Sequence, residues 1–254
     1  MKKTTLIVAL IQLCMVIVLS ACTTQPSQSN RSKPSPDINA LVTNSLVQTQ
    51  RGALVQAQQT INQALILDPE NVDANNIAGL IYGKSQKAEL AVKHFEKALS
   101  IAGNDASTLN NYGNFLCEYG RTEQAEEKFF RAGSHPSNPN PEIAYTNAGL
   151  CALRVPDIDQ AENYFKTALD FKEKNSVALF QLAKINFTKG RGIPGLERLQ
   201  SYSQIAPHTP ETLKLGMEIG RLMRDKEVVV SYFNLLQNEF PTSEEYQWAI
   251  ATIE

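Results

Sequence analysis

The sequence has few of the residues from which enzymes build catalytic or metal sites. Its 254 residues include three histidines and four cysteines, and no pair of them stands at metal-ligand spacing. No glycine-rich phosphate loop follows a strand, and no strand pattern is apparent. His94, His135 and His208 are scattered along the chain, so we expect surface or capping roles for them. The sequence therefore predicts no enzymatic activity, no cofactor and no small-molecule substrate, unless the fold assembles a titratable cluster from distant segments.

A strong charge of either sign is also missing. Lysine and arginine together number 24, and aspartate and glutamate number 26, which gives a formal net charge of −2. No block of like charges suggests a tail. This balance gives no general attraction to nucleic acid or to an anionic membrane surface. We therefore expect no nucleic-acid partner.

The amino terminus has the pattern of a secretion signal. Two lysines precede an apolar run from Leu6 to Val18, which only Gln12 interrupts, and the run ends at Leu19-Ser20-Ala21-Cys22. This run is too short to be a comfortable membrane span. The last four residues resemble a bacterial lipobox, and the resemblance implies that Cys22 is acylated and becomes the mature first residue. The alternative is a plain cleaved signal, residues 1–21, with an incidental cysteine.

The residues that follow Cys22 predict where such an anchor would hold the protein. Thr23 stands where an aspartate would resemble an inner-membrane retention signal, so the sequence favours the periplasmic face of the outer membrane in a double-membrane bacterium. Residues 22–37 are almost entirely polar and cannot bury enough apolar area to fold, which predicts a flexible tether. Two or more acyl chains would give stable attachment to the bilayer.

The rest of the sequence repeats itself with a period of about 34 residues, the period of a tetratricopeptide helix–turn–helix unit. Small and aromatic residues recur in phase between Asn75 and Ala98 and in two later copies. The three copies are Ala78, Gly79, Tyr82, Ala91, Phe95 and Ala98; Tyr112, Gly113, Leu116, Ala125, Phe129 and Ala132; and Ala148, Gly149, Ala152, Ala161, Phe165 and Ala168.

Each recurring residue has a packing role. Glycine or alanine lets the two helices of a pair approach closely, the aromatic residue fills the space beside them, and the last alanine admits the next pair, so each repeat buries its apolar face against its neighbours. The pattern predicts an all-α fold, a right-handed superhelical solenoid of six repeats followed by a capping helix. The predicted bounds are about 38–71, 72–105, 106–140, 141–175, 176–209 and 210–242 for the repeats and 243–254 for the capping helix.

Some positions of the pattern are less regular. In repeat five Gly195 replaces the packing alanine, and in repeat six Phe233 is the expected packing aromatic. Three glycines, Gly52, Gly120 and Gly190, occupy the same repeat position, where the turn between paired helices requires a positive φ. We expect the same left-handed conformation at Gly103, after the second helix of repeat two.

Two cysteines belong to the predicted repeats. Cys117 and Cys151 lie near the same end of the first helices of consecutive repeats. Neighbouring helices at roughly 8–10 Å allow inward-leaning cysteines to reach disulfide distance, and an oxidising periplasm favours their pairing. The sequence predicts a Cys117–Cys151 disulfide, and the alternative is two buried free thiols.

A partner groove is predicted on the first helix of each pair. One stripe of this helix faces its partner helix, so the second, fifth, ninth and twelfth positions form a separate stripe that lines the groove. Its asparagines suit the backbone of an extended or helical peptide, and its aliphatic residues supply apolar anchors. The alternative is that the asparagines are only solvated. The predicted contact residues are Val42, Leu46, Asn76, Leu80, Asn110 and Asn114.

The run Asn110-Asn111-Tyr112-Gly113-Asn114-Phe115-Leu116-Cys117, together with six repeats behind a lipobox, resembles the type IV pilus biogenesis lipoproteins of the PilF/PilW family. Asn114 departs from the larger residue of many relatives. The resemblance implies a pilotin: a lipid-anchored outer-membrane scaffold that helps secretin subunits of the pilus localise and form their ring. A scaffold for outer-membrane protein assembly or cell-wall synthesis would have the same architecture and remains the alternative.

Overall fold

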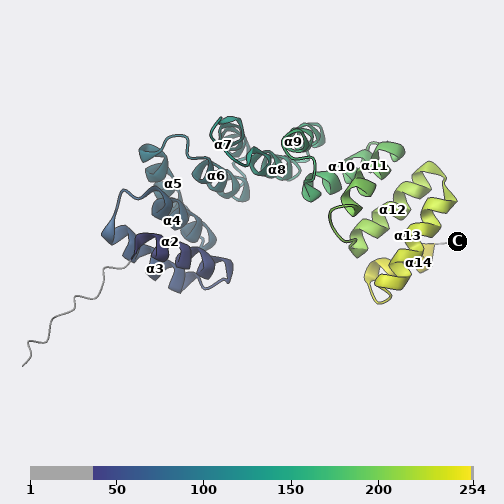
Figure 1. The fold of residues 1–254 in the computed structure, drawn as a ribbon, viewed down its shortest axis with the longest axis horizontal. Helices are drawn as coiled ribbons and strands as arrows, with labels where there is room; N and C mark the ends of the chain where they lie inside the picture. Colours follow the sequence, from purple (N-terminus) through teal and green to yellow (C-terminus); the bar gives the residue numbers. More distant parts are fainter. Residues whose placement is uncertain (1–36, 253–254) are drawn as a thin grey trace, which may run out of the picture. The chain divides into compact units, whose positions relative to one another are not determined.

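The computed structural model describes residues 37–252, which form thirteen helices and no strands (Figure 1). The signal segment, Cys22 and most of the predicted tether lie outside the described residues. The helices belong to one compact unit that begins at Ile38. Their bounds are α2 Ile38–Gln50, α3 Leu54–Leu67, α4 Val72–Lys84, α5 Ala88–Ile101, α6 Ala106–Glu118, α7 Thr122–Ser134, α8 Pro141–Ala152, α9 Ile158–Phe171, α10 Ser176–Thr188, α11 Gly192–Ser203, α12 Pro210–Met223, α13 Lys226–Glu239 and α14 Glu244–Thr252.

The first twelve of these helices form six consecutive pairs, from α2 with α3 to α12 with α13. In four places the first helices of neighbouring pairs also pack on each other, α2 on α4, α4 on α6, α6 on α8 and α10 on α12. The predicted all-α fold of six helix pairs and a final helix is therefore confirmed. Among the helices of residues 37–252, none is long and apolar enough to cross a membrane.

The turn inside each pair depends on a residue with a positive φ. Gly52, Gly120 and Gly190 have φ angles of 76°, 72° and 70°, as the sequence predicts, and glycine adopts this conformation without a steric penalty. Gln86 has a φ of 60° at the same position of repeat two, although it carries a side chain. The prediction for Gly103 was wrong, because this glycine is not among the positive-φ residues of the described chain.

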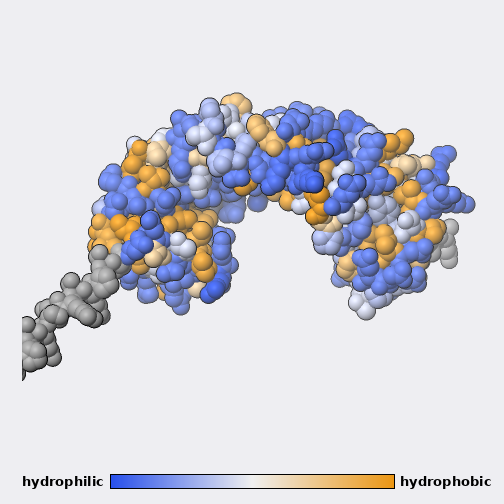
Figure 2. Space-filling model, in the orientation of Figure 1, coloured by the Kyte–Doolittle hydropathy of each residue, from blue (hydrophilic) through white to orange (hydrophobic). Residues whose placement is uncertain are grey.

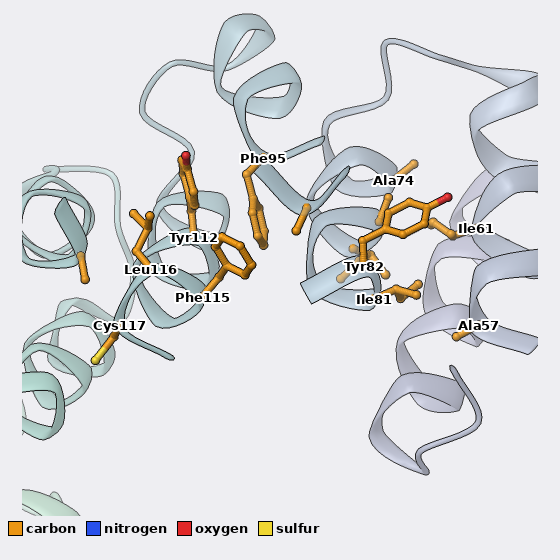
Figure 3. Packing of buried hydrophobic residues seen from close by; sticks show 14 of the residues in the cluster. Ala57, Ile61, Ala74, Ile81, Tyr82, Phe95, Tyr112, Phe115, Leu116 and Cys117 are labelled. Atoms are coloured by element: carbon orange, nitrogen blue, oxygen red, sulfur yellow. The ribbon is translucent and has the colours of Figure 1, made fainter. Parts of the chain in front are cut away.

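Glycine–phenylalanine contacts hold the helix pairs of repeats two to four together. A Cβ atom on Gly79 would lie 2.7 Å from the ring of Phe95, so the ring lies directly on the helix backbone. Gly113 with Phe129 and Gly149 with Phe165 repeat this contact at the same distance. Figure 3 shows Phe95 beside the rings of the next repeat, and its centroid lies 5.1 Å from that of Tyr112. The packing therefore continues from one repeat into the next.

Repeats five and six keep the helix pairs but change the contacts. In repeat five the positions of the glycine and the aromatic residue hold Ala183 and Leu199, both fully buried. In repeat six a Cβ atom on Gly216 would lie 2.4 Å from Tyr232, whereas Phe233 is only partly buried. The prediction that Phe233 is the packing aromatic is therefore wrong by one residue. Gly216 and Tyr232 follow Ala183 and Leu199 by 33 residues, one fewer than the 34 between Gly79 and Gly113, so the shift arises before Gly216.

Between repeats four and five, a buried carboxylate replaces part of the apolar packing. Glu162 of α9 is 6% exposed and contacts three cations, Lys166 at 2.6 Å, Lys189 at 2.6 Å and Arg191 at 2.9 Å. Burial opposes ionisation of Glu162, but the hydrogen bonds from these cations outweigh it and lower its pKa to about 2. Lys189 and Arg191 lie in the turn between α10 and α11, so the cluster joins the two repeats electrostatically.

The last helix covers the end of repeat six. Helix α14 packs against α12 and α13, and its Ala249 is fully buried. The ring of Trp248 lies 4.7 Å from the ammonium of Lys214 and 4.8 Å from the guanidinium of Arg221, both on α12. The hydroxyl of Ser243 accepts a hydrogen bond from the Tyr246 amide and so caps the start of α14.

Exposed hydrophobic residues are not spread evenly over the surface. Figure 2 shows them over the N-terminal helices and again over the C-terminal helices, whereas the surface between them, over α7 to α9, is mostly hydrophilic. The most exposed aliphatic residues are Ile66, at 80%, and Val55, at 68%, both on α3, and Ile193 on α11 is 65% exposed. Because single exposed aliphatic residues are common on protein surfaces, hydrophobicity alone does not identify a binding site here.

Candidate protein-binding groove

A hollow of about 380 Å³ lies along the first helices of repeats two, three and four. We call it the α4–α6–α8 hollow. Helices α4, α6 and α8 all contribute to its wall, so its shape depends on how three consecutive repeats stack. Its lining includes Gly79, Leu80, Gly83, Lys84, Asn111, Asn114, Cys117, Glu118, Asn147, Leu150, Cys151 and Arg154.

Small residues keep this hollow open. A Cβ atom on Gly83 would lie 2.9 Å from the ring of Phe115, so the glycine leaves no side chain on that part of the wall. Leu80 is partly buried against the core, and Leu150 is 37% exposed. The hollow therefore combines an apolar wall with enough space for the side chain of a partner.

Asparagines of adjacent first helices bond to one another beside the hollow. The amide nitrogen of Asn76 donates to the hydroxyl of Ser107 at 3.1 Å, and its oxygen accepts from Asn111 at 3.0 Å. In the next repeat Asn147 donates to the oxygen of Asn110 at 2.9 Å. These bonds fix the stagger of α4, α6 and α8, and they hold the orientation of Asn111 and Asn147.

We call these bonds, among Asn76, Ser107, Asn111, Asn110 and Asn147, the asparagine ladder. It corrects the predicted role of Asn76. Its side chain is 2% exposed, and both ends of its amide bond within the chain, so it is not available to a bound peptide. Asn111 and Asn147 instead line the hollow, and each uses only part of its hydrogen-bonding capacity within this network. Sequence reasoning missed them, although each stands two residues before a packing glycine, Gly113 or Gly149.

The other five predicted contact residues divide into three groups. Leu80 and Asn114 line the α4–α6–α8 hollow. Asn110 lines a second hollow of about 390 Å³ at the start of α6 and α8. Val42 and Leu46 of α2 pack, partly buried, against the core of the first repeats. The structure thus brings together only part of the predicted stripe, because the two aliphatic residues of repeat one support the core.

A covalent link joins two of the helices that form the hollow. The sulfur atoms of Cys117 and Cys151 lie 2.06 Å apart, and their Cα atoms are 5.9 Å apart. Both residues line the hollow while being 7% and 1% exposed, respectively. A disulfide here ties α6 to α8 at the floor of the hollow, so it would limit changes in the width of the groove.

Charged side chains line the hollow where α4, α6 and α8 end. Lys84 and Glu118 are the last residues of α4 and α6, and Arg154 follows the end of α8. All three are exposed. The ion pairs of residues 37–252 include none of them. These three residues, which we call the rim charges, are therefore free to interact with a partner.

The histidines of the repeats have packing contacts. His94 stacks on Tyr82 with ring centroids 5.3 Å apart, and its Nδ1 lies 3.0 Å from the side-chain oxygen of Asn75. Burial, with a smaller contribution from Lys93, lowers the pKa of His94, so this ring is mainly neutral at neutral pH. His208 similarly contacts Tyr232 edge to face. Both rings therefore stabilise the packing of their repeats.

Comparison with known proteins identifies the repeats and two close structural matches. Tetratricopeptide repeat models match residues 72–105 and 94–127. The type IV pilus assembly protein PilF of Pseudomonas aeruginosa is 27% identical over 198 residues, which cover 78% of this chain and 79% of that protein. The solved structure of PilF matches 84% of this chain and 96% of its own, with a TM-score of 0.71 and 27% identity. PilW, described as a widely conserved type IV pilus biogenesis factor, matches 84% of this chain and 98% of its own, with a TM-score of 0.71 and 28% identity.

Another relative matches less completely. Anaphase-promoting complex subunit 3 of Schizosaccharomyces pombe is 27% identical over 72% of this chain, but the match covers only 27% of that protein. Such matches reflect the repeat itself. PilF and PilW instead match this chain over most of their own lengths.

Proposed function

Since the chain belongs to the PilF and PilW family of tetratricopeptide-repeat proteins, we propose that it is an outer-membrane-anchored scaffold of type IV pilus biogenesis that assists the pilus secretin. The proposal rests above all on the match with PilF, which extends along nearly four-fifths of both chains. Such a repeat array is suited to non-catalytic protein binding, because its stacked helices present a long surface built from many side chains.

Capture of a secretin segment by the α4–α6–α8 hollow is the mechanism that we propose. Leu80 and Leu150 would contact an apolar side chain of the segment, and Asn111, Asn114 and Asn147 would bond to its backbone. The ladder and the Cys117–Cys151 link hold these groups in place before the partner arrives, which reduces the entropy lost on binding.

The lipid at Cys22 would concentrate this binding at the membrane. A scaffold held at the inner leaflet of the outer membrane keeps each bound secretin subunit near the other subunits with which it assembles. Tethering of this kind raises the effective concentration of the subunits without any new contact between them. The proposed roles of the anchor and of the groove are therefore distinct, and different substitutions can test them.

Deletion of the gene tests the function as a whole. We expect secretin multimers, followed on gels, to diminish in the deletion strain and to return when the full-length chain is supplied. Normal multimers and normal pili in the deletion strain would reject the role in secretin assembly. Recovery of an outer-membrane assembly subunit or a cell-wall synthase in place of the secretin, in pull-downs from solubilised membranes, would favour a scaffold for another envelope machine.

Two substitutions separate the groove from the anchor. Leu150→Glu places a charge on the apolar wall of the hollow, and we expect it to reduce secretin multimers while the protein stays in the membrane fraction. Ile66→Glu on α3 is the matched control, because it introduces the same charge at an exposed aliphatic residue away from the hollow. Equal losses with both variants would contradict a specific role for the hollow. Cys22→Ser should release the protein from membranes, and continued pelleting after alkaline washing would exclude lipid as the anchor.

A further inference from the structure

From the rim charges we infer the kind of partner segment that the hollow binds. It is an extended segment with three charged side chains in the order acidic, basic and acidic, and with apolar residues between them. This inference rests on the proposed protein-binding role of the α4–α6–α8 hollow and specifies its ligand. The rim charges alternate in sign from repeat two to repeat four, as Lys84, Glu118 and Arg154. A partner with the opposite order, acidic, basic and acidic, would be complementary to them.

A charged residue does not stand at this helix end in every repeat, although Arg221 in the last turn of α12 is also charged. The last residues of α2 and α10, on either side of these three repeats, are the uncharged Gln50 and Thr188. The repeat pattern therefore does not require a charge here for packing. Because the rim charges are exposed and make no ion pair within residues 37–252, folding does not account for them either.

Glu118 is unfavourably placed for the stability of its own helix. It is the last residue of α6, where the carbonyl groups leave a partial negative charge that repels a carboxylate. The basic side chains Lys84 and Arg154, in contrast, are favourably placed at the ends of α4 and α8. A carboxylate that opposes the helix dipole and makes no ion pair within residues 37–252 is explained by a role in binding a basic group of the partner.

The geometry of stacked helices sets the spacing of the complementary charges. Packed helices lie about 8–10 Å apart, and an extended chain advances about 3.3 Å per residue. Rim charges on adjacent repeats therefore match partner residues about three positions apart. The apolar residue of the partner lies between the charges, where Leu80 and Leu150 form the wall of the hollow, and the amides of Asn111 and Asn147 contact its backbone.

Two synthetic peptides test this inference with the full-length protein in detergent. The first has aspartate at positions one and seven, lysine at position four and leucine on either side of the lysine. The second exchanges aspartate and lysine. Both patterns are symmetric, so they do not depend on the direction in which the peptide lies in the groove. We expect the wild-type protein to bind the first peptide at least about tenfold more tightly in fluorescence anisotropy, through charge-assisted contacts.

Charge reversal provides the decisive comparison. The double variant Lys84→Glu with Arg154→Glu should reverse the preference and favour the second peptide. The control Lys93→Glu with Arg198→Glu changes the net charge equally at exposed residues of α5 and α11, and it should keep the wild-type preference. Absence of any preference in the wild-type protein, absence of binding, or an equal effect of both variants would overturn the inference. Circular dichroism confirms that the variants are folded.

Glu118→Gln adds a readout that does not depend on the other two rim charges. It should weaken binding of the first peptide and also raise the melting temperature slightly, because it removes the unfavourable charge from the end of α6. Unchanged peptide affinity would contradict the role of Glu118. A deletion strain that loses secretin multimers while the peptides show no preference would leave the proposed function standing and reject only this ligand.

Discussion

Repeats two to four and repeats five and six build the same helix pairs from different contacts. In the first group the same glycine–phenylalanine contact occurs three times at one distance, 2.7 Å. In the second group Ala183 lies opposite Leu199, and the contact of Gly216 is with a tyrosine one residue out of the expected register. The difference shows that a helix pair needs a close approach at this position but not one particular pair of residues.

The regular group also carries the candidate site. The asparagine ladder, the Cys117–Cys151 link and the rim charges all lie on repeats two to four. A groove formed by three consecutive repeats requires that each be placed identically relative to the next. Identical packing contacts supply this regularity, whereas repeats five and six can vary because they contribute none of the residues of the hollow.

The largest expected effect comes from removing the disulfide of the regular group. Cys117→Ala with Cys151→Ala opens a link between residues 34 positions apart and should cost about 2–4 kcal/mol of unfolding free energy. Urea unfolding followed by circular dichroism should show the loss. The fluorescence of Trp248, the single tryptophan, reports on α14 and repeat six and should change much less. An equal shift of both signals would show that the two groups unfold as one unit.

Acid should weaken the junction between the two groups. The pKa of Glu162 is about 2 in the folded chain and 4.5 is its ordinary value, so its contribution is complete above pH 4.5 and is lost as the pH falls towards 2. Because its cations are partly exposed, we expect this contribution to be on the order of 1–3 kcal/mol. Glu162→Gln should therefore destabilise the protein at pH 7 and have little effect near pH 2. An equal difference in unfolding free energy between the wild type and the variant at both pH values would contradict this role of the Glu162 charge.

Adding a methyl group to a buried glycine should lower the stability in the regular group and keep or raise it in the irregular group. Gly113→Ala would place its Cβ 2.7 Å from the buried ring of Phe129, and we expect a net loss of about 1–2 kcal/mol from overpacking. At Gly195 the nearest atom is the flexible end of Ile219, at 3.3 Å, and the equivalent residues of repeats one to four are alanines. Gly195→Ala should be neutral or stabilise by up to about 1 kcal/mol through helix propensity. Shifts of the urea midpoint in the same direction for both variants would show that the contacts of the two groups are equivalent.

The smallest expected effect is a gain at the turn of repeat two. Gln86 has a φ of 60°, where repeats one, three and five have glycine. Gln86→Gly should stabilise the chain by about 0.5–1 kcal/mol, because a side chain disfavours this conformation. Arg224→Gly, at a φ of 59° in repeat six, is the matched variant in the irregular group. A loss of thermal stability in both variants would show that contacts of these side chains outweigh the backbone strain.

The sequence predicted the fold better than the site because the two depend on different kinds of information. Packing residues repeat along the chain, so their period and their turn glycines can be read directly. The groove depends on how far one repeat is rotated against the next. Asn76 occupies a position assigned to the groove, but it is buried in a ladder with Ser107 and Asn111, whereas Asn147 lines the hollow. The predicted stripe was derived from a single helix, so it carries no information about the rotation of one repeat against the next.

By itself the sequence determined that the chain is an all-α array, where its pairs of helices begin and turn, and which cysteines could meet. These properties follow from local propensity and from contacts between adjacent repeats, which leave a periodic trace. Only the tertiary structure decided which asparagines are buried, that Tyr232 packs against Gly216, and that Lys84, Glu118 and Arg154 line one hollow. The physical reason is that burial and charge proximity depend on the stacking of three repeats at once.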